Sequence, residues 1–247
     1  MIRRITRFII FVGCLFSICQ CAFAQRHEQL WLDYQIDYPF ANQYLFEVNG
    51  SYQTVLTKDR WRSINVGPTF EYSVLNNLDL LSEVSFTSTL QKEGSNSFEI
   101  APMVGVRYHI TQGKRVVSRL LLRYQERNFY QIEDKYWDVS NRVRLKGEMN
   151  ICINGPNLFT DNLWYAILDY EEFVVMDDQV NERYANRRRA RIGISYRYNY
   201  EHRFDLIYTR QTSRNEIGDD FVSNDNVIQL RYKMFLNPGR QVGSQSR

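Results

Sequence analysis

Cysteine is scarce in this 247-residue chain, and no apolar run is long enough for a membrane helix. Three of the four cysteines, Cys14, Cys19 and Cys21, lie in the first 24 residues, which leaves Cys152 as the remaining thiol. A lone thiol excludes an internal disulfide and a cysteine-rich metal site. After residue 24 no segment approaches about 18 consecutive apolar residues, which excludes transmembrane helices.

Histidine is also rare, and the common catalytic motifs are missing. The three histidines are His27, His109 and His202. The sequence contains no G-x-S-x-G, H-E-x-x-H, phosphate-loop or EF-hand pattern. No motif supports a catalytic pairing of His109 with a serine such as Ser85. We therefore expect a protein that is not an enzyme and that uses no metal and no cofactor.

The first 24 residues have the pattern of a cleaved secretory signal peptide. Arg3, Arg4 and Arg7 precede a short apolar stretch at residues 8–18, and Ala-Phe-Ala at residues 22–24 is a cleavage signal. We expect Gln25 to begin the mature chain. The alternative is an uncleaved anchor, but the apolar stretch is shorter than the roughly 20 residues of a membrane span.

The excess positive charge of the chain disappears with this segment. The whole chain has 31 Lys and Arg against 28 Asp and Glu. Since the signal carries three arginines and no acid, the mature chain has 28 of each and is neutral. A nucleic-acid partner would need net positive charge, and we expect none.

Aromatic residues and alternating segments are abundant instead. Aromatics form 15% of the chain, with 17 tyrosines, and the mean hydropathy is −0.46. Eleven segments alternate apolar and polar residues with the period of a β-strand. They are residues 29–38, 43–54, 61–73, 77–89, 97–109, 116–126, 136–149, 163–174, 187–200, 202–213 and 226–236.

The length of these segments favours a membrane barrel over a soluble β-protein. Strands of soluble proteins usually have about 5 or 6 residues, whereas a tilted membrane strand needs roughly 9–11. We therefore predict an all-β fold, an antiparallel up-and-down transmembrane β-barrel of about 10–12 strands over residues 25–236, followed by a flexible tail at 237–247. Since bacterial single-chain barrels have even strand numbers, either one strand is missed or the first segment lies outside the closed wall.

The segment at 187–200 illustrates the two faces that such a strand would have. Ile192 and Ile194 alternate with Arg189, Arg191 and Arg197. In a membrane barrel the aliphatic face contacts lipid and the cationic face lines the lumen. In a soluble β-protein the same faces would contact a core and water, and this alternative stays open.

The predicted connections alternate between short and long. Tight links fall at 75–77, 111–114 and 199–202, and longer polar links at 90–96, 127–135, 177–185 and 214–225. Short turns on one side and long loops on the other are typical of membrane barrels. The link at 150–162 is an exception on the short side, for which we expect a brief helix or a plug.

Two sets of side chains are candidates for functional roles. The charged residues predicted to line the lumen are Arg119, Arg123, Arg142, Arg144, Arg189, Arg191, Arg197, Arg203, Glu47, Glu71, Glu83, Glu99 and Asp205. They either form an ion-pair network that fills a narrow barrel or provide a passage or pocket for anions. The residues predicted for an interfacial aromatic girdle are Trp164, Tyr196, Tyr198, Tyr200 and Tyr232.

Two local segments carry a family resemblance. They are QLWLDYQIDY at residues 29–38 and QLRYKMF at residues 229–235. With the signal and the charged lumen faces, they make the chain resemble a family of small Gram-negative outer-membrane barrels known only as a domain of unknown function. The resemblance covers the whole mature chain and implies no activity.

The sequence thus predicts a porin-like outer-membrane barrel of a Gram-negative bacterium, with a structural role or passage of small polar solutes through a narrow charged lumen. Its expected partners are outer-membrane lipid, lipopolysaccharide, the barrel-assembly machinery and small polar or anionic solutes. Two alternatives are a barrel enzyme acting on lipid or lipopolysaccharide and a soluble periplasmic barrel binding an apolar ligand.

Overall fold

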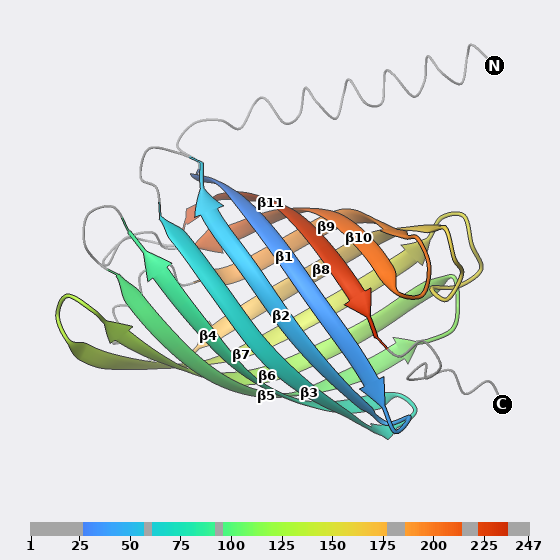
Figure 1. Ribbon diagram of the computed structural model, residues 1–247, viewed down its shortest axis with the longest axis horizontal. Helices are drawn as coiled ribbons and strands as arrows, with labels where there is room; N and C mark the ends of the chain where they lie inside the picture. Colours follow the sequence, from blue (N-terminus) through green and yellow to red (C-terminus); the bar gives the residue numbers. More distant parts are fainter. Residues whose placement is uncertain (1–26, 57–60, 92–95, 177–185, 214–221, 237–247) are drawn as a thin grey trace, which may run out of the picture.

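The structure, a computed structural model, is a closed β-barrel of eleven strands (Figure 1). It describes residues 27–56, 61–91, 96–176, 186–213 and 222–236. The predicted signal at 1–24 and the tail at 237–247 lie outside these ranges. The strands are β1(His27–Phe40), β2(Tyr44–Val55), β3(Arg62–Leu75), β4(Leu78–Leu90), β5(Ser97–Thr111), β6(Val116–Gln131), β7(Tyr136–Cys152), β8(Leu163–Val175), β9(Asn186–Arg197), β10(His202–Ser213) and β11(Val222–Phe235).

The predicted all-β barrel is therefore confirmed, and each predicted segment corresponds to one strand. Consecutive strands pair antiparallel around the wall, and β1 pairs with β11 in parallel to close it. The expectation of an even strand number is wrong, because all eleven segments belong to the closed wall. A chain that reverses direction at every turn leaves its first and eleventh strands running the same way, so closure has to be parallel.

The connections divide between the two ends of the barrel. We call the end with links 41–43, 76–77, 112–115, 153–162 and 198–201 the turn end, and the opposite one the loop end. The predicted long link at 127–135 is wrong: β6 continues to Gln131, and residues 132–135 close a hairpin that extends beyond the rest of the wall (Figure 1). No helix that could cross a membrane occurs in the described ranges.

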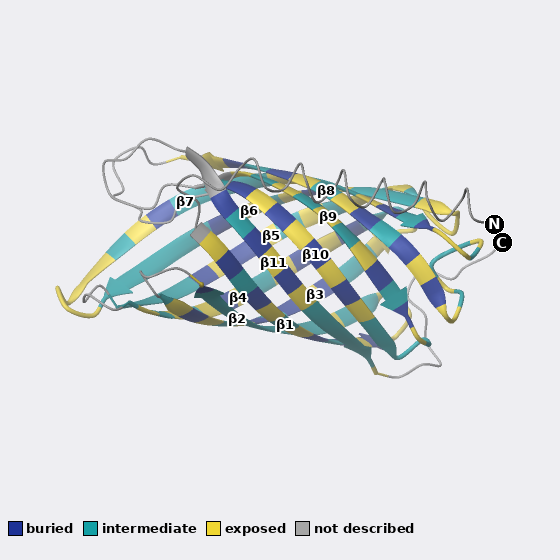
Figure 2. Ribbon diagram, turned by 90° about the horizontal axis from the view of Figure 1, so that it is seen from above, coloured by how far each residue is buried: buried dark blue, intermediate teal, exposed yellow. Residues whose placement is uncertain are grey.

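Buried and exposed positions alternate along the strands (Figure 2). On β9, Ile192 is 56% exposed, whereas the side chain of its neighbour Arg191 is 9% exposed. Over the part of the chain that the structure describes, 44 large hydrophobic side chains are exposed and 13 hydrophobic residues are buried. The apolar face of the wall thus points outward and the polar face inward, the reverse of an ordinary globular protein.

Gly193 permits a close approach of β9 and β10. It pairs with Ile207, and a Cβ at Gly193 would lie 2.8 Å from the carbonyl oxygen of Leu206 and 2.9 Å from Cγ1 of Ile207. Such distances are too short for a side chain. Gly147 on β7 differs, because its nearest neighbour would be Cδ2 of Leu120 at 3.7 Å.

Candidate functional site: the charged interior of the barrel

All of the charged residues predicted to line the lumen lie on the inward face of their strands. The alternation of strands places them there, opposite the exposed apolar positions. Their interactions separate into an ion-pair cluster on β6 to β9 and a cavity at the turn end.

Glu171 on β8 is the centre of the ion-pair cluster. It is fully buried, and its carboxylate forms ion pairs with Arg123 and Arg144 and longer contacts of 3.7 and 3.6 Å with Arg189 and Arg191. Four arginines from three strands thus share one carboxylate.

The cluster continues toward the turn end through two further carboxylates. Asp169 accepts from Arg191 Nε at 2.6 Å and lies 3.6 Å from Lys146 Nζ. Lys146 also donates to Glu148 at 2.8 Å, and Glu148 pairs with Arg119 as well. These contacts link β6, β7, β8 and β9 across the interior side of the wall.

The predicted set omits the interior arginines Arg127 and Arg107. Arg127 pairs with Glu99 through two nitrogens, at 2.7 and 2.9 Å, and Arg107 binds Glu71 in the same two-pronged manner. Arg127 was assigned to a loop. Arg107 lies on a clearly alternating strand, whose period places it inward, so that signal was available.

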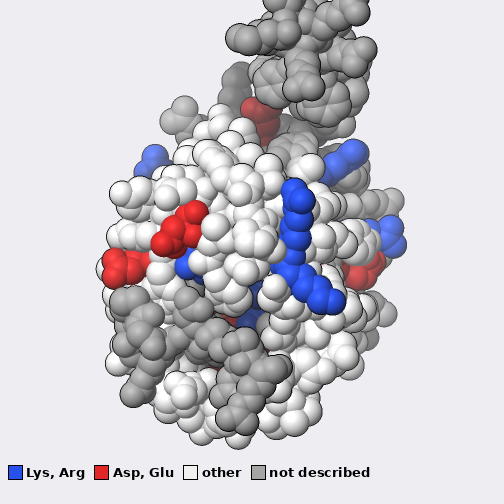
Figure 3. All heavy atoms as spheres, turned by 90° about the vertical axis from the view of Figure 1, so that its right-hand side faces the viewer, with Lys and Arg blue, Asp and Glu red and all other residues white. Residues whose placement is uncertain are grey.

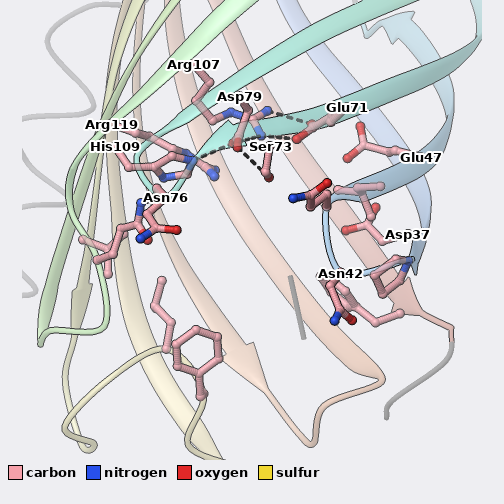
Figure 4. A pocket seen from close by; sticks show the side chains of 18 of the residues that line it. Asp37, Asn42, Glu47, Glu71, Ser73, Asn76, Asp79, Arg107, His109 and Arg119 are labelled. Atoms are coloured by element: carbon pink, nitrogen blue, oxygen red, sulfur yellow. Dashed lines mark hydrogen bonds and ion pairs between the residues drawn. The ribbon is translucent and has the colours of Figure 1, made fainter. Parts of the chain in front are cut away.

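A cavity of about 870 Å³ occupies the turn end (Figure 4). On one side Asp79 accepts from Ser73 at 2.8 Å and contacts His109 Nε2 at 2.6 Å. Asp79 lies between the hydroxyl and the imidazole, and Ser85 donates to the carbonyl of Ala101 instead. Of the residues with described positions, no serine is hydrogen-bonded to His109, whose partner is Asp79.

The opposite side of the cavity holds charges of both signs that form no ion pair with a described residue. Asp37 and Glu47 both accept from the Gln35 amide, at 2.7 and 2.5 Å. Arg203 lies over the ring of Phe235 at 4.1 Å. Lys233 also lines the cavity. This half of the interior offers separated acidic and basic groups to a polar solute or to water.

The link at 153–162 partly covers the turn end. Leu158 packs against a buried cluster that includes Leu163, Tyr165 and Ile207, and its carbonyl accepts from Arg197. The segment forms turns and contains no helix, so the expected brief helix is wrong. Leu158 and Phe159 line the cavity, and the alternative of a plug stays a prediction. From this end, a few charged side chains are visible at the rim and others lie deeper near the middle (Figure 3).

Most of the predicted girdle residues lie on the outer face near the turn end. The rings of Trp164 and Tyr196 lie 4.7 Å apart, and Tyr232 contacts Phe204 at 5.1 Å. Tyr198 is also exposed there. Tyr200 differs from the prediction, because it follows the end of β9 and lines the cavity.

The phenol of Tyr200 lies in the cavity lining, where burial changes its acidity. Burial raises the pKa of the Tyr200 phenol. Among residues with described positions, no group of three or more His, Cys, Asp or Glu side chains is arranged to hold a metal ion.

The fold and this interior define a class of protein: a closed, mostly antiparallel β-barrel with an apolar exterior and a charged interior. The chain belongs to the family described as "Protein of unknown function (DUF2490)", whose model matches residues 28–222. The match covers β1 to β10 and ends where the closing strand β11 begins. No curated protein matches the sequence.

Proposed function

We propose that this protein is an outer-membrane β-barrel of a Gram-negative bacterium, exported with residues 1–24 as a removed signal. The observation that carries the proposal is the exposure of large apolar side chains around the whole wall. A contiguous apolar surface of this extent is costly in water, and lipid chains or a partner have to cover it. Strands of 12 to 17 residues are long enough to cross a bilayer.

The role that we propose is structural, with passage limited to small polar solutes. The Glu171 cluster lines the interior side of β6 to β9 with paired charged side chains, and small barrels commonly have side chains in their lumen. The turn-end cavity would then be a water-filled vestibule that leads to a constriction. Recordings in planar bilayers test this, and we expect small conductance; a large, open conductance would contradict a filled lumen.

Membrane fractionation and a heat-dependent gel shift test the membrane location. We expect the mature protein in the outer-membrane fraction, migrating faster on gels before boiling than after it. A folded monomer in detergent-free buffer would contradict the proposal and favour a soluble periplasmic barrel. The charged lining of the cavity already argues against an apolar ligand there.

One contact favours a second candidate, an enzyme acting on lipid or lipopolysaccharide. His109 and Asp79 line the cavity, and Nε2 of His109 lies 2.6 Å from a carboxylate oxygen of Asp79. In such an arrangement a carboxylate can orient a histidine base. The test compares lipid profiles of a deletion strain complemented with the unsubstituted protein or with His109→Ala. Profiles that do not change on deletion would remove this candidate.

A further inference from the structure

The barrel interior along β6 to β9 holds more cationic side chains than carboxylates that pair with them. Of the residues that the structure places, eight cationic side chains on β6 to β9 face four carboxylates, three on β7 and β8 and one on β5, and seven of the eight form an ion pair with one of them. The cations are Arg119, Arg123, Arg127, Arg142, Arg144, Lys146, Arg189 and Arg191, and the carboxylates are Glu99, Glu148, Asp169 and Glu171. Seven of these cations are arginines, which stay protonated in proteins, so an excess of at least three charges over the four carboxylates cannot be removed by losing a proton.

Three of these arginines gather around one ring. The guanidinium carbons of Arg142, Arg144 and Arg189 lie 5.3, 4.8 and 5.4 Å from the ring centre of Phe173. Phe173 is buried on β8, between β7, which carries the first two arginines, and β9, which carries the third. Three positive charges from two strands thus meet at one place on the barrel interior.

The donors of this group are incompletely used. Arg142 donates through Nε to the Gln125 amide oxygen at 2.9 Å and has no carboxylate partner in the described part of the chain. Arg189 reaches Glu171 only at 3.7 Å, and its Nε is buried without a hydrogen-bond partner. Unpaired charges and donors removed from water are costly, and a bound anion would satisfy both.

We propose that Arg142, Arg144 and Arg189 bind a soluble phosphate-like oxyanion inside the barrel, beside Phe173. The planar guanidinium fork matches the oxygens of such an anion, and a surplus of several charges favours a polyvalent one. The side chains point inward, so the ligand comes from the lumen and not from a lipid headgroup on the outer face. The inference requires the closed barrel but not its membrane location.

Thermal unfolding of the full mature protein in a non-ionic detergent tests the site. The probe is inorganic phosphate, compared with chloride at matched ionic strength, after purification without phosphate. We expect phosphate to raise Tm by about 3 °C or more. Arg142→Gln and Arg189→Gln should each remove most of that rise while raising Tm in chloride, because each relieves repulsion among the remaining arginines.

Arg188→Gln is the matched control. Arg188 precedes Arg189 in the chain but points outward, where it is exposed and paired with Glu172 at 2.9 Å. It should keep the full response to phosphate. Equal Tm values in phosphate and chloride for the unsubstituted protein would overturn the proposal. This result is expected if carboxylates elsewhere in the chain neutralise the cluster. An equal loss of response in Arg188→Gln would assign the effect to the surface and also overturn it. A protein that proves water-soluble can be measured in plain buffer, which separates this result from the membrane question.

Discussion

Ile192 and Arg191 are neighbours on β9 that point to opposite sides of the wall, and substitutions there distinguish the two environments. In the proposed outer-membrane location, arginine on the lipid side near the bilayer midplane costs about 2–4 kcal/mol, so Ile192→Arg should strongly reduce stability. Arg191→Leu should do less damage, because Lys146 stays near Asp169 and other arginines stay on Glu171. Urea unfolding in lipid vesicles measures both, and the reverse order of damage would contradict the assignment of faces.

Glu171 is the residue on which the ion-pair cluster depends most. Glu171→Gln would leave four arginines without their shared carboxylate, and breaking a buried pair by removing one partner typically costs about 3–5 kcal/mol. Glu172→Gln is the control, since Glu172 faces outward and pairs with exposed Arg188, for which a change of about 0–1 kcal/mol is expected. Denaturant midpoints of the two variants should differ clearly; similar midpoints would show that the cluster adds little stability.

For single residues, alternation predicts which face of the wall a side chain occupies but not which residue it pairs with. The inward positions of Arg144 and Arg189 followed from the period of their strands. Their convergence on Glu171 did not, because it depends on the register between β7, β8 and β9. Tyr200 was misplaced for a related reason: it lies past the last paired residue of β9, where alternation no longer applies.

Among the elements, β9 and β10 depend on a glycine at their closest contact. Gly193→Ala would place a methyl group against the Leu206 carbonyl, so we expect a loss of about 1–3 kcal/mol. Gly147→Ala has ordinary contact distance around it and should be nearly neutral. Thermal unfolding of the two variants, side by side, measures the difference. A tolerated alanine at 193 would mean that the two strands can move apart at no cost.

The strands could be predicted from sequence because eleven long segments alternate clearly. Their ends were harder to place. Beyond Gln125, β6 carries Glu126 and Asn128 on its outward face, so the alternation fades although the strand continues to Gln131. The link at 153–162 has no period at all, and its contacts with the cavity depend on tertiary packing.

For the whole molecule, the parallel closure of β1 on β11 can be tested by cross-linking. In a Cys152→Ala background, Leu30→Cys with Ile228→Cys joins directly paired positions and should form a disulfide. Leu30→Cys with Met234→Cys should not, because Met234 pairs with Ile36, roughly 20 Å further along at about 3.3 Å per residue. An antiparallel seam centred on Asp33 and Arg231 would give the opposite result on non-reducing gels.

Whether the barrel has an even or an odd number of strands could not be predicted. The alternation of each strand carries no information about which strands close the wall. Eleven alternating segments are compatible with a missed twelfth strand, with an open first strand or with parallel closure. Pairing along eleven positions of β1 and β11 decides among them.

Parallel closure has a consequence for the two ends of the polypeptide. β1 enters the wall at the loop end, and β11 leaves it at the turn end (Figure 1). In the proposed outer membrane, with short turns toward the periplasm, a peptide fused ahead of Glu28 would be exposed at the cell surface. A peptide fused behind Leu236 would lie in the periplasm. Antibody labelling of intact cells should therefore detect only the amino-terminal epitope.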